Sequence, residues 1–222
     1  MSPILQHRSL PESVHEILRG QILNDSIPAG TALVELALAE EFGVSRTTIR
    51  TALLSLQAER LVEISPRRGT TVTRMSPEAS EELCAARYAL EAVHLSEVLN
   101  TGRVALVTEM SAAVEQMAQA AVEQDAVGVI DADTVLHRAI MAAGGNRLLA
   151  DMWESLNGQM GALMRSTFDR KGIDLAETVR WHERLVRAFR RKEPAAAVLA
   201  LHDHYLSGAV SKIRRVATQE TQ

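Results

Sequence analysis

Two residues that could bind a metal ion lie four positions apart in an otherwise apolar segment. The stretch DADTVLH covers residues 131 to 137 and contains Asp133 and His137 among Ala, Val and Met residues. Residues four apart share one face of an α-helix, so this carboxylate and this imidazole could bind the same ion. A surface pair explains the same spacing, and the rest of the chain has to decide between the two interpretations.

Three histidines further along the chain extend this pair. His182 lies in one predicted helix, and His202 and His204 lie in the last one. One carboxylate with three imidazoles suits Zn, Ni, Mn or Fe and leaves coordination positions for water or a ligand. His202 and His204 are about 200° apart on an ideal helix, so spacing alone leaves open which of them binds. The stronger apolar stripe of this helix favours an inward His202, and a weaker stripe of small residues lies near His204. The stronger stripe consists of Val198, Tyr205 and Ala209.

Composition places the chain among globular, mainly helical proteins. Of its 222 residues, 46% are hydrophobic and 23% are charged, which is enough for one or two domains with a buried core. Aromatic residues make up only 3%, which favours helix over sheet. Cys84 is the single cysteine, is expected to be a small buried residue, and leaves no intrachain disulfide. The sequence contains neither a signal-peptide pattern nor an apolar run that could span a membrane, so we expect a cytoplasmic protein.

The composition changes at MSPEA (75–79), and this change divides the chain into expected domains 1–75 and 76–222. The second domain shows no strand pattern and six helical segments, separated by NTG, EQD, GGN, RKGID and KEP. The predicted helices are 77–99, 103–123, 126–143, 147–168, 174–191 and 194–217. We therefore expect an all-helical, six-helix bundle that carries the possible metal ligands.

The first domain reads as three helices followed by a hairpin. The spacing predicts a short helix from Glu35 to Phe42 that ends at Gly43, and a third helix that begins after Ser45 as its N-cap. LVEIS (61–65) and TTVTR (70–74) alternate like strands around the turn PRRG. Two helices joined by a Gly-containing turn form a helix-turn-helix, and the hairpin resembles its wing.

The charge distribution supports DNA binding. The net charge is −4, but the segment from Val44 to Arg74 holds six Arg against two Glu. A local basic patch can bind phosphate in an acidic protein. The second helix of such a motif reads the major groove by its N-terminal residues, and a wing can contact phosphate or the minor groove. The candidate DNA-binding residues are Ser45, Arg46, Thr47, Thr48 and Arg50 in the helix, and Arg67, Arg68 and Gly69 in the wing. Solvated arginines on a surface helix are the alternative.

The segment AGTALVELALAEEFGVSRTTIRTALLSLQAERLVEISPRRGTTV resembles the winged helix of GntR-type bacterial repressors. The matching elements are the turn at Gly30, LVE with LAEEFGVSRT, the helix that contains Arg50, ERLV and PRRG..V. Thr48, Thr51 and Leu36 depart from residues that are frequent in the family, and these departures bear on the operator sequence rather than on the activity. The resemblance implies a homodimer that binds a pseudo-palindromic DNA operator.

The segment from about 80 to 215 is similar to the FCD domain, the all-helical effector domain of the FadR subfamily. The similarity lies in RYALE (87–91), DTVLH (133–137), GGN (144–146), WHERLVRAF (181–189) and ALHDHY (200–205). It implies a divalent metal held by Asp133, His137, His182 and His204; the family's 22-residue spacing from His182 favours His204. It also implies a small organic acid effector that completes the coordination of the metal.

Arg87 stands where the family has an arginine and could clamp the carboxylate of the effector. A surface salt bridge with Glu91, four residues on, is the other interpretation of this residue. Asn146 is expected to cap a helix, and Trp153 and Trp181 are expected in the core or in a cavity wall.

Three functions are compatible with these features. The first is a ligand-responsive transcriptional regulator whose metal-anchored effector controls DNA binding, and we expect it to be a repressor. The second is a metal sensor in which the metal itself is the signal. The third, a metal-dependent enzyme, would leave the winged helix unexplained and offers no clear general base beside the four ligands.

Overall fold

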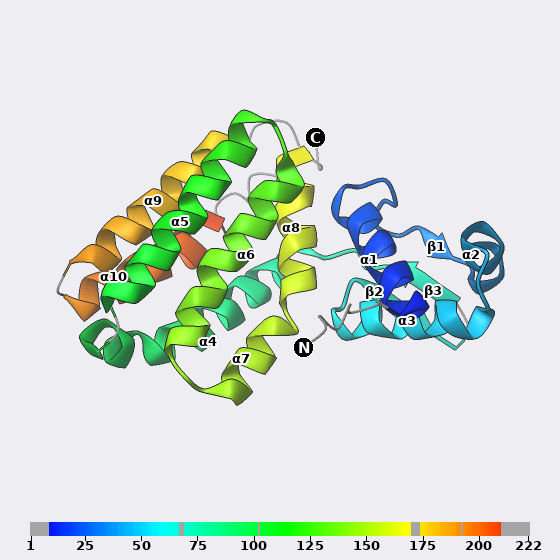
Figure 1. The fold of residues 1–222 in the computed structure, drawn as a ribbon, viewed down its shortest axis with the longest axis horizontal. Coiled ribbons are helices and arrows are strands. Elements are labelled where there is room, and N and C mark those ends of the chain that lie inside the picture. The colour runs from blue at the N-terminus through cyan, green and yellow to red at the C-terminus, as the bar shows by residue number, and fades with distance from the viewer. Residues whose placement is uncertain (1–8, 67–68, 102, 170–173, 192, 210–222) are drawn as a thin grey trace, which may run out of the picture. The chain divides into compact units, whose positions relative to one another are not determined.

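The chain divides into two units, Met1–Arg74 and Met75–Gln222, one residue before the boundary that composition indicates. Figure 1 shows the computed structural model, which describes residues 9–66, 69–101, 103–169, 174–191 and 193–209. No helix among these residues is both long and apolar enough to cross a membrane. The predicted class, mainly helical with an N-terminal winged helix-turn-helix and an all-helical second unit, is confirmed.

The first unit contains the predicted three helices and hairpin. Helix α1 is Leu10–Leu23, α2 is Glu35–Phe42 and α3 is Arg46–Ala58. Ser9 opens α1 with a capping box, and the hydroxyl of Ser45 accepts the Thr48 N–H at 3.1 Å to open α3. Gly43 ends α2 with a φ of 64°, the left-handed conformation expected of a C-terminal glycine. The caps at Ser9, Gly43 and Ser45 fix where the helices begin and end, and they thereby fix the position at which α3 starts.

The apolar face of α3 is buried, and its polar face is exposed. Ile49, Leu53 and Leu56 are at most 1% exposed and pack in the core with Leu18 of α1. A three-stranded antiparallel sheet completes the unit in the order β1, β3, β2. The strands are Ala32–Leu33 (β1), Val62–Ser65 (β2) and Gly69–Val72 (β3). β1 was not among the predicted strands because two residues are too short to show an alternating pattern.

The second unit consists of helices. They are α4 (Pro77–Thr101), α5 (Arg103–Val122), α6 (Ala126–Ala143), α7 (Arg147–Glu154), α8 (Asn157–Asp169), α9 (Leu175–Arg190) and α10 (Pro194–His202), followed by a π-helical segment, Asp203–Ala209. α5 packs against α6 and α9, and α10 packs against α4 and α9, as Figure 1 shows. Their contacts enclose a core around Phe189, Leu136 and Leu201. Cys84 is buried in this core, as expected, and burial raises the pKa of its thiol to about 12.

The predicted single helix 147–168 is two helices in the structure. Asn146 caps α7 as expected, by accepting the Leu149 N–H. At Ser155 the hydroxyl donates to the Met152 carbonyl at 2.7 Å, and the Leu156 N–H bonds the Trp153 carbonyl three residues back. Side-chain hydroxyls compete in this way with the helical ladder, and spacing alone does not reveal where. The break separates Trp153 in α7 from Asn157 in α8.

The predicted last helix, 194–217, is regular only to His202. From Asp203 to Ala209 the chain continues as a π-helix, and residues 210–217 lie outside the described part. The i→i+5 turn is wider than that of an α-helix, so successive residues are rotated by less than the α-helical 100°. His204 and Tyr205, two adjacent side chains of this segment, both face the interior, as the adjacent Leu136 and His137 do on α6.

Candidate metal centre and nucleic-acid interface

Asp133, His137, His182 and His204 come together in the interior of the helical unit. Each offers one ligand atom, and these atoms all lie within 4.8 Å of one another. The Nε2 atom of His182 lies 2.8 Å from Oδ1 of Asp133, and Nε2 of His137 lies 3.8 Å from the same oxygen. Ligands about 2.0–2.2 Å from a zinc ion are at most about 4.4 Å apart, so a small contraction would place all four around one ion.

The hydrogen bonds of two histidines leave the same nitrogen available. Nδ1 of His182 is 2.8 Å from the Thr178 carbonyl oxygen, and Nδ1 of His137 is 2.7 Å from Oε2 of Glu91. A carbonyl or carboxylate oxygen accepts, so each Nδ1 carries a proton, and in the neutral imidazole each Nε2 then has a lone pair. Both Nε2 atoms are buried and make no well-aligned hydrogen bond among the described residues, although Nε2 of His182 lies 2.8 Å from Oδ1 of Asp133. This tautomer and this second contact are typical of imidazoles that bind metals.

The carboxyl group of Asp133 is kept ionised. Burial alone would raise its pKa, but the nearby imidazoles of His137, His182 and His204 and the contact with His182 lower the pKa well below its usual range. Metal ligands must be deprotonated, so this environment suits an anionic oxygen ligand. The donor set of one carboxylate and three imidazoles fits Zn, Ni, Mn or Fe.

His204, not His202, is the histidine of the last helix that joins the cluster. The ring of His204 lies 4.6 Å from that of His182 and 5.1 Å from that of His137, between centroids. His202 instead meets Tyr88 edge-on and has a side chain that is 45% exposed. The buried side of α10 is the weaker stripe, where Ala197 and Leu201 are 0% exposed, and His204 follows Leu201 by three residues on that side; the stronger apolar stripe therefore indicated the wrong histidine.

Glu91 of α4 is a buried carboxylate with four neighbouring donors. It is 0% exposed, and its oxygens accept from Nδ1 of His137, Nε1 of Trp153 and the hydroxyl of Tyr205, each at 2.7 Å. The Nε atom of Arg87 lies 3.5 Å away. Burial would raise the pKa of Glu91, but the contacts with His137, Arg87 and Trp153 lower it, so the group is ionised. Glu91 thus links α4, α6, α7 and the π-helix.

Arg87 forms a salt bridge with Glu91, but in the core rather than on the surface. Arg87 is 1% exposed, and its guanidinium lies 3.9 Å from the ring centre of Trp153. Its Nε donates to Tyr205 and its Nη1 to the side-chain oxygen of Asn157, whereas Nη2 lacks a partner among the described residues. A two-donor clamp on a carboxylate would therefore have to displace one of these partners.

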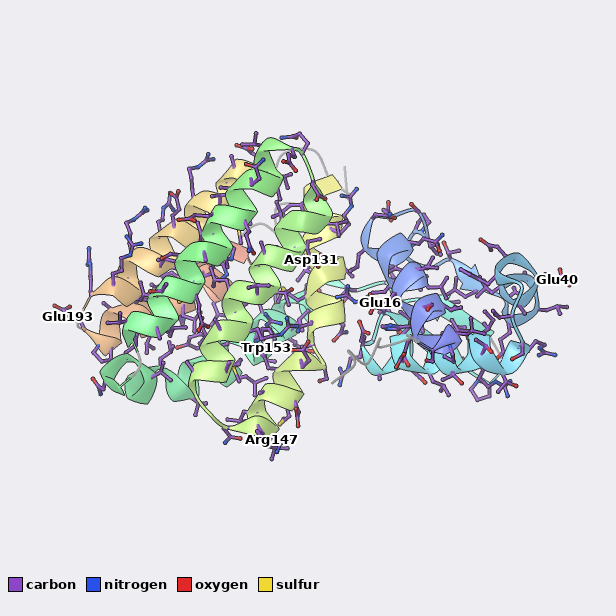
Figure 2. All side chains as sticks on the ribbon, viewed as in Figure 1. Glu16, Glu40, Asp131, Arg147, Trp153 and Glu193 are labelled. Atoms are coloured by element: carbon purple, nitrogen blue, oxygen red, sulfur yellow. The ribbon has the colours of Figure 1, made fainter. Side chains whose placement is uncertain are left out.

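The sequence contains a signal for this network that helical spacing alone does not reveal. Arg87 and Glu91 lie on the buried stripe of α4, in line with Cys84 and Leu95. Charged residues at core positions require partners, as Asp133 and His137 do on α6. Trp153, labelled in Figure 2 inside the helical unit, is buried as expected, but its indole N–H makes a specific contact that composition does not reveal.

At the N-terminal end of α3 the predicted side chains are exposed except that of Thr48, which is half-buried with its hydroxyl 2.8 Å from that of Ser45. Arg46 and Arg50 have side chains that are 64% and 65% exposed, and both contact Glu35 of α2. Ser45 is the N-cap of α3, so its hydroxyl oxygen already accepts a hydrogen bond from the Thr48 N–H. Gly69 has a φ of 75° and begins β3. Arg67 and Arg68 of the expected wing lie outside the described residues.

Two family descriptions match the chain. Residues 82–207 match the FCD domain, and residues 10–72 match the bacterial regulatory proteins of the gntR family. The FCD match includes all four clustered residues and Glu91, and the gntR match includes α1 to α3 and the sheet.

Curated relatives are similar over most of the chain. The gluconate operon transcriptional repressor of Bacillus subtilis is 27% identical over 192 residues, which are 85% of this chain and 79% of that protein. The regulator McbR of Escherichia coli is 24% identical over 190 residues, 85% of this chain and 86% of that protein.

Solved structures share the fold. The structure of E. coli McbR/YncC has a TM-score of 0.74 at 23% identity and covers 96% of this chain and 99% of its own. A putative GntR regulator from Rhodococcus sp. RHA1 has a TM-score of 0.77 at 22% identity, and covers 94% and 99%.

The buried network predicts an unequal response to the loss of two carboxylates. Glu91→Ala should lower the free energy of unfolding of the helical unit by about 3–5 kcal/mol, because it leaves buried donors and a buried charge unpaired. Glu183→Ala removes an exposed pair with Arg187 and should cost about 0–1 kcal/mol. Both tryptophans, Trp153 and Trp181, lie in this unit, so urea unfolding followed by tryptophan fluorescence measures it separately. Equal losses in the two variants would contradict the role assigned to the network.

Proposed function

Because the chain belongs to the GntR family of bacterial regulatory proteins and carries an FCD domain, it is a transcriptional regulator, and we propose that it is a repressor controlled by a metal-anchored organic acid. Its family and relatives are DNA-binding regulators, so the enzyme interpretation is set aside. The observation that carries the proposal is the cluster of four ligand atoms within 4.8 Å, two of them buried imidazole nitrogens that make no well-aligned hydrogen bond among the described residues.

The ligands in this proposal are Asp133, His137, His182 and His204. Four protein ligands leave one or two positions open on a metal that prefers five or six. A divalent ion is the largest local charge in such a site, so a small carboxylate would be attracted to an open position. Arg87 is the candidate for a second contact with the effector carboxylate, through Nη2. A contact through Nη1 as well would require Asn157 to move.

Operator binding in this proposal depends on the exposed end of α3 in each subunit of a homodimer. Two-fold symmetry requires two half-sites at a spacing that the dimer sets. Ser45, Arg46, Thr47, Thr48 and Arg50 are the proposed contacts in the helix, with Arg67, Arg68 and Gly69 in the wing. The effector can change repression only through different affinities for the DNA-bound and released arrangements.

The recognition-helix proposal predicts a loss of operator binding without a loss of fold. Arg46→Ala and Arg50→Ala should each weaken operator binding by about 5- to 150-fold, since one good bidentate contact with a base is worth about 1–3 kcal/mol. Gel shifts on a DNA duplex selected by the wild-type protein measure this, and circular dichroism checks the fold. Arg60→Ala, at a position after α3, is the matched control. Unchanged binding by both variants would show that α3 does not read DNA.

The metal proposal predicts that two histidines two residues apart behave differently. His204→Ala and His182→Ala should lose most of the bound metal after dialysis, whereas His202→Ala should retain it, because His202 lies outside the cluster. Elemental analysis per subunit measures the occupancy. Full occupancy in His182→Ala would mean that the ion binds elsewhere.

The effector proposal predicts stabilisation that requires both an acid and a metal. In a thermal-shift screen of small organic acids, the active acid should raise the melting temperature of metal-loaded protein and not of metal-stripped protein. The corresponding amide, which cannot offer a carboxylate, is the control. Release of the operator by metal alone would favour the alternative function, a metal-sensing regulator.

A further inference from the structure

Glu35, the first residue of α2, joins the two arginines at the exposed end of α3. Nε of Arg50 donates to one carboxylate oxygen at 3.0 Å, and its Nη2 donates to the other at 3.4 Å. Nη2 of Arg46 donates to that second oxygen at 3.3 Å. The side chain of Glu35 is only 23% exposed, whereas those of both arginines are about two-thirds exposed. An acidic residue therefore contacts both arginines of the surface that is proposed to approach DNA.

These contacts restrict how Arg50 can meet another molecule. A guanidinium is planar and offers five N–H donors along its edges. Glu35 occupies the edge formed by Nε and Nη2, which leaves the edge formed by Nη1 and the second hydrogen of Nη2. Two parallel N–H groups of this kind match the O6 and N7 acceptors of guanine. A phosphate contact carries no sequence information and gains little from the restraint.

The charge of Glu35 opposes indiscriminate binding. Hydrogen bonds from Arg50 and Arg46 lower the pKa of Glu35, so the carboxylate is ionised at neutral pH. Its negative charge offsets part of the positive charge of the arginines near the DNA backbone. Binding to unrelated DNA depends almost entirely on that positive charge, whereas binding to an operator also depends on base contacts.

We propose that Glu35 is a specificity-determining positioning residue, which orients Arg46 and Arg50 for base contacts and disfavours their capture by the phosphates of unrelated DNA. The inference rests on the proposed assignment of α3 as the reading helix and does not involve the candidate metal centre. A purely structural role, in which Glu35 only fastens α2 to α3, would alter stability without altering the preference for one DNA sequence over another.

A matched control is available on the same helix. Glu40 carries the same charge near the other end of α2, is exposed, and has no ion pair with these arginines among the described residues. Figure 2 shows Glu40 at the outer side of α2. Glu40→Gln and Glu35→Gln therefore change the net charge of the domain equally, and only Glu35→Gln removes the restraint on the arginines.

The experiment compares two DNA duplexes by fluorescence anisotropy with the full-length protein. One duplex is selected from a random pool by the wild-type protein, and the other is a scrambled duplex of the same composition. Glu35→Gln should bind the scrambled duplex more tightly, and the ratio of the two affinities should fall by roughly three- to tenfold, the loss of two exposed ion pairs. Glu40→Gln should leave the ratio unchanged. An equal change of the ratio in both variants, or no change in a folded Glu35→Gln protein, overturns the proposal.

Two further variants separate the possible failures. If Glu35→Gln does not fold, Glu35→Asp keeps the charge and shortens the reach, and the ratio should again fall; an unchanged ratio overturns the proposal. If Arg50→Ala discriminates between the duplexes as well as the wild type does, the assignment of the reading helix is wrong and the role of Glu35 is overturned with it. If Arg50→Ala loses discrimination and Glu35→Gln retains it, only the role of Glu35 is wrong.

Discussion

An ionised carboxylate without access to water, that of Glu91, determines how the interior of the helical unit is arranged. Such a group is costly to bury unless hydrogen bonds and a countercharge replace its hydration. Here the hydrogen bonds come from His137, Trp153 and Tyr205, and the countercharge comes from Arg87. These partners belong to different helices, so satisfying one carboxylate fixes α4, α6, α7 and the π-helix relative to one another.

The candidate metal centre depends on this arrangement through His137. The hydrogen bond to Glu91 holds the proton on Nδ1 and leaves Nε2 for the cluster around Asp133. Tyr205 connects the same carboxylate to the π-helix that carries His204. Burial raises the pKa of the Tyr205 hydroxyl well above its usual value, so the hydroxyl keeps its proton and remains a donor. The hydrogen bonds of Glu91 thus determine which nitrogen of His137 carries the proton, and they help to orient the residues that could bind the metal.

Sequence spacing was sufficient for features that lie on one clear helical face. It was insufficient where two faces of a helix compete or where a helix is interrupted. The winged helix-turn-helix, its caps and the pairing of Asp133 with His137 follow from periodicity and cap residues. The choice of His204 over His202 does not, because the last helix buries its weaker stripe, with Ala197 and Leu201, and not its more apolar one. The break at Ser155 depends on one hydroxyl that competes with the backbone. The burial of Arg87 and Glu91 was missed because an i,i+4 ion pair is usually a surface feature.

The two Arg–Glu pairs differ in one physical respect, exposure, and that difference separates their roles. Arg87 and Glu91 are at most 1% exposed, so exchanging either partner would strand a charge in the core, and the pair acts as a fixed part of the framework. Arg50 and Glu35 are partly exposed, so water and DNA phosphates compete for the arginine at little cost. An exposed pair can therefore restrain an arginine and still release it, which is what a reading helix needs if it must leave unrelated DNA quickly.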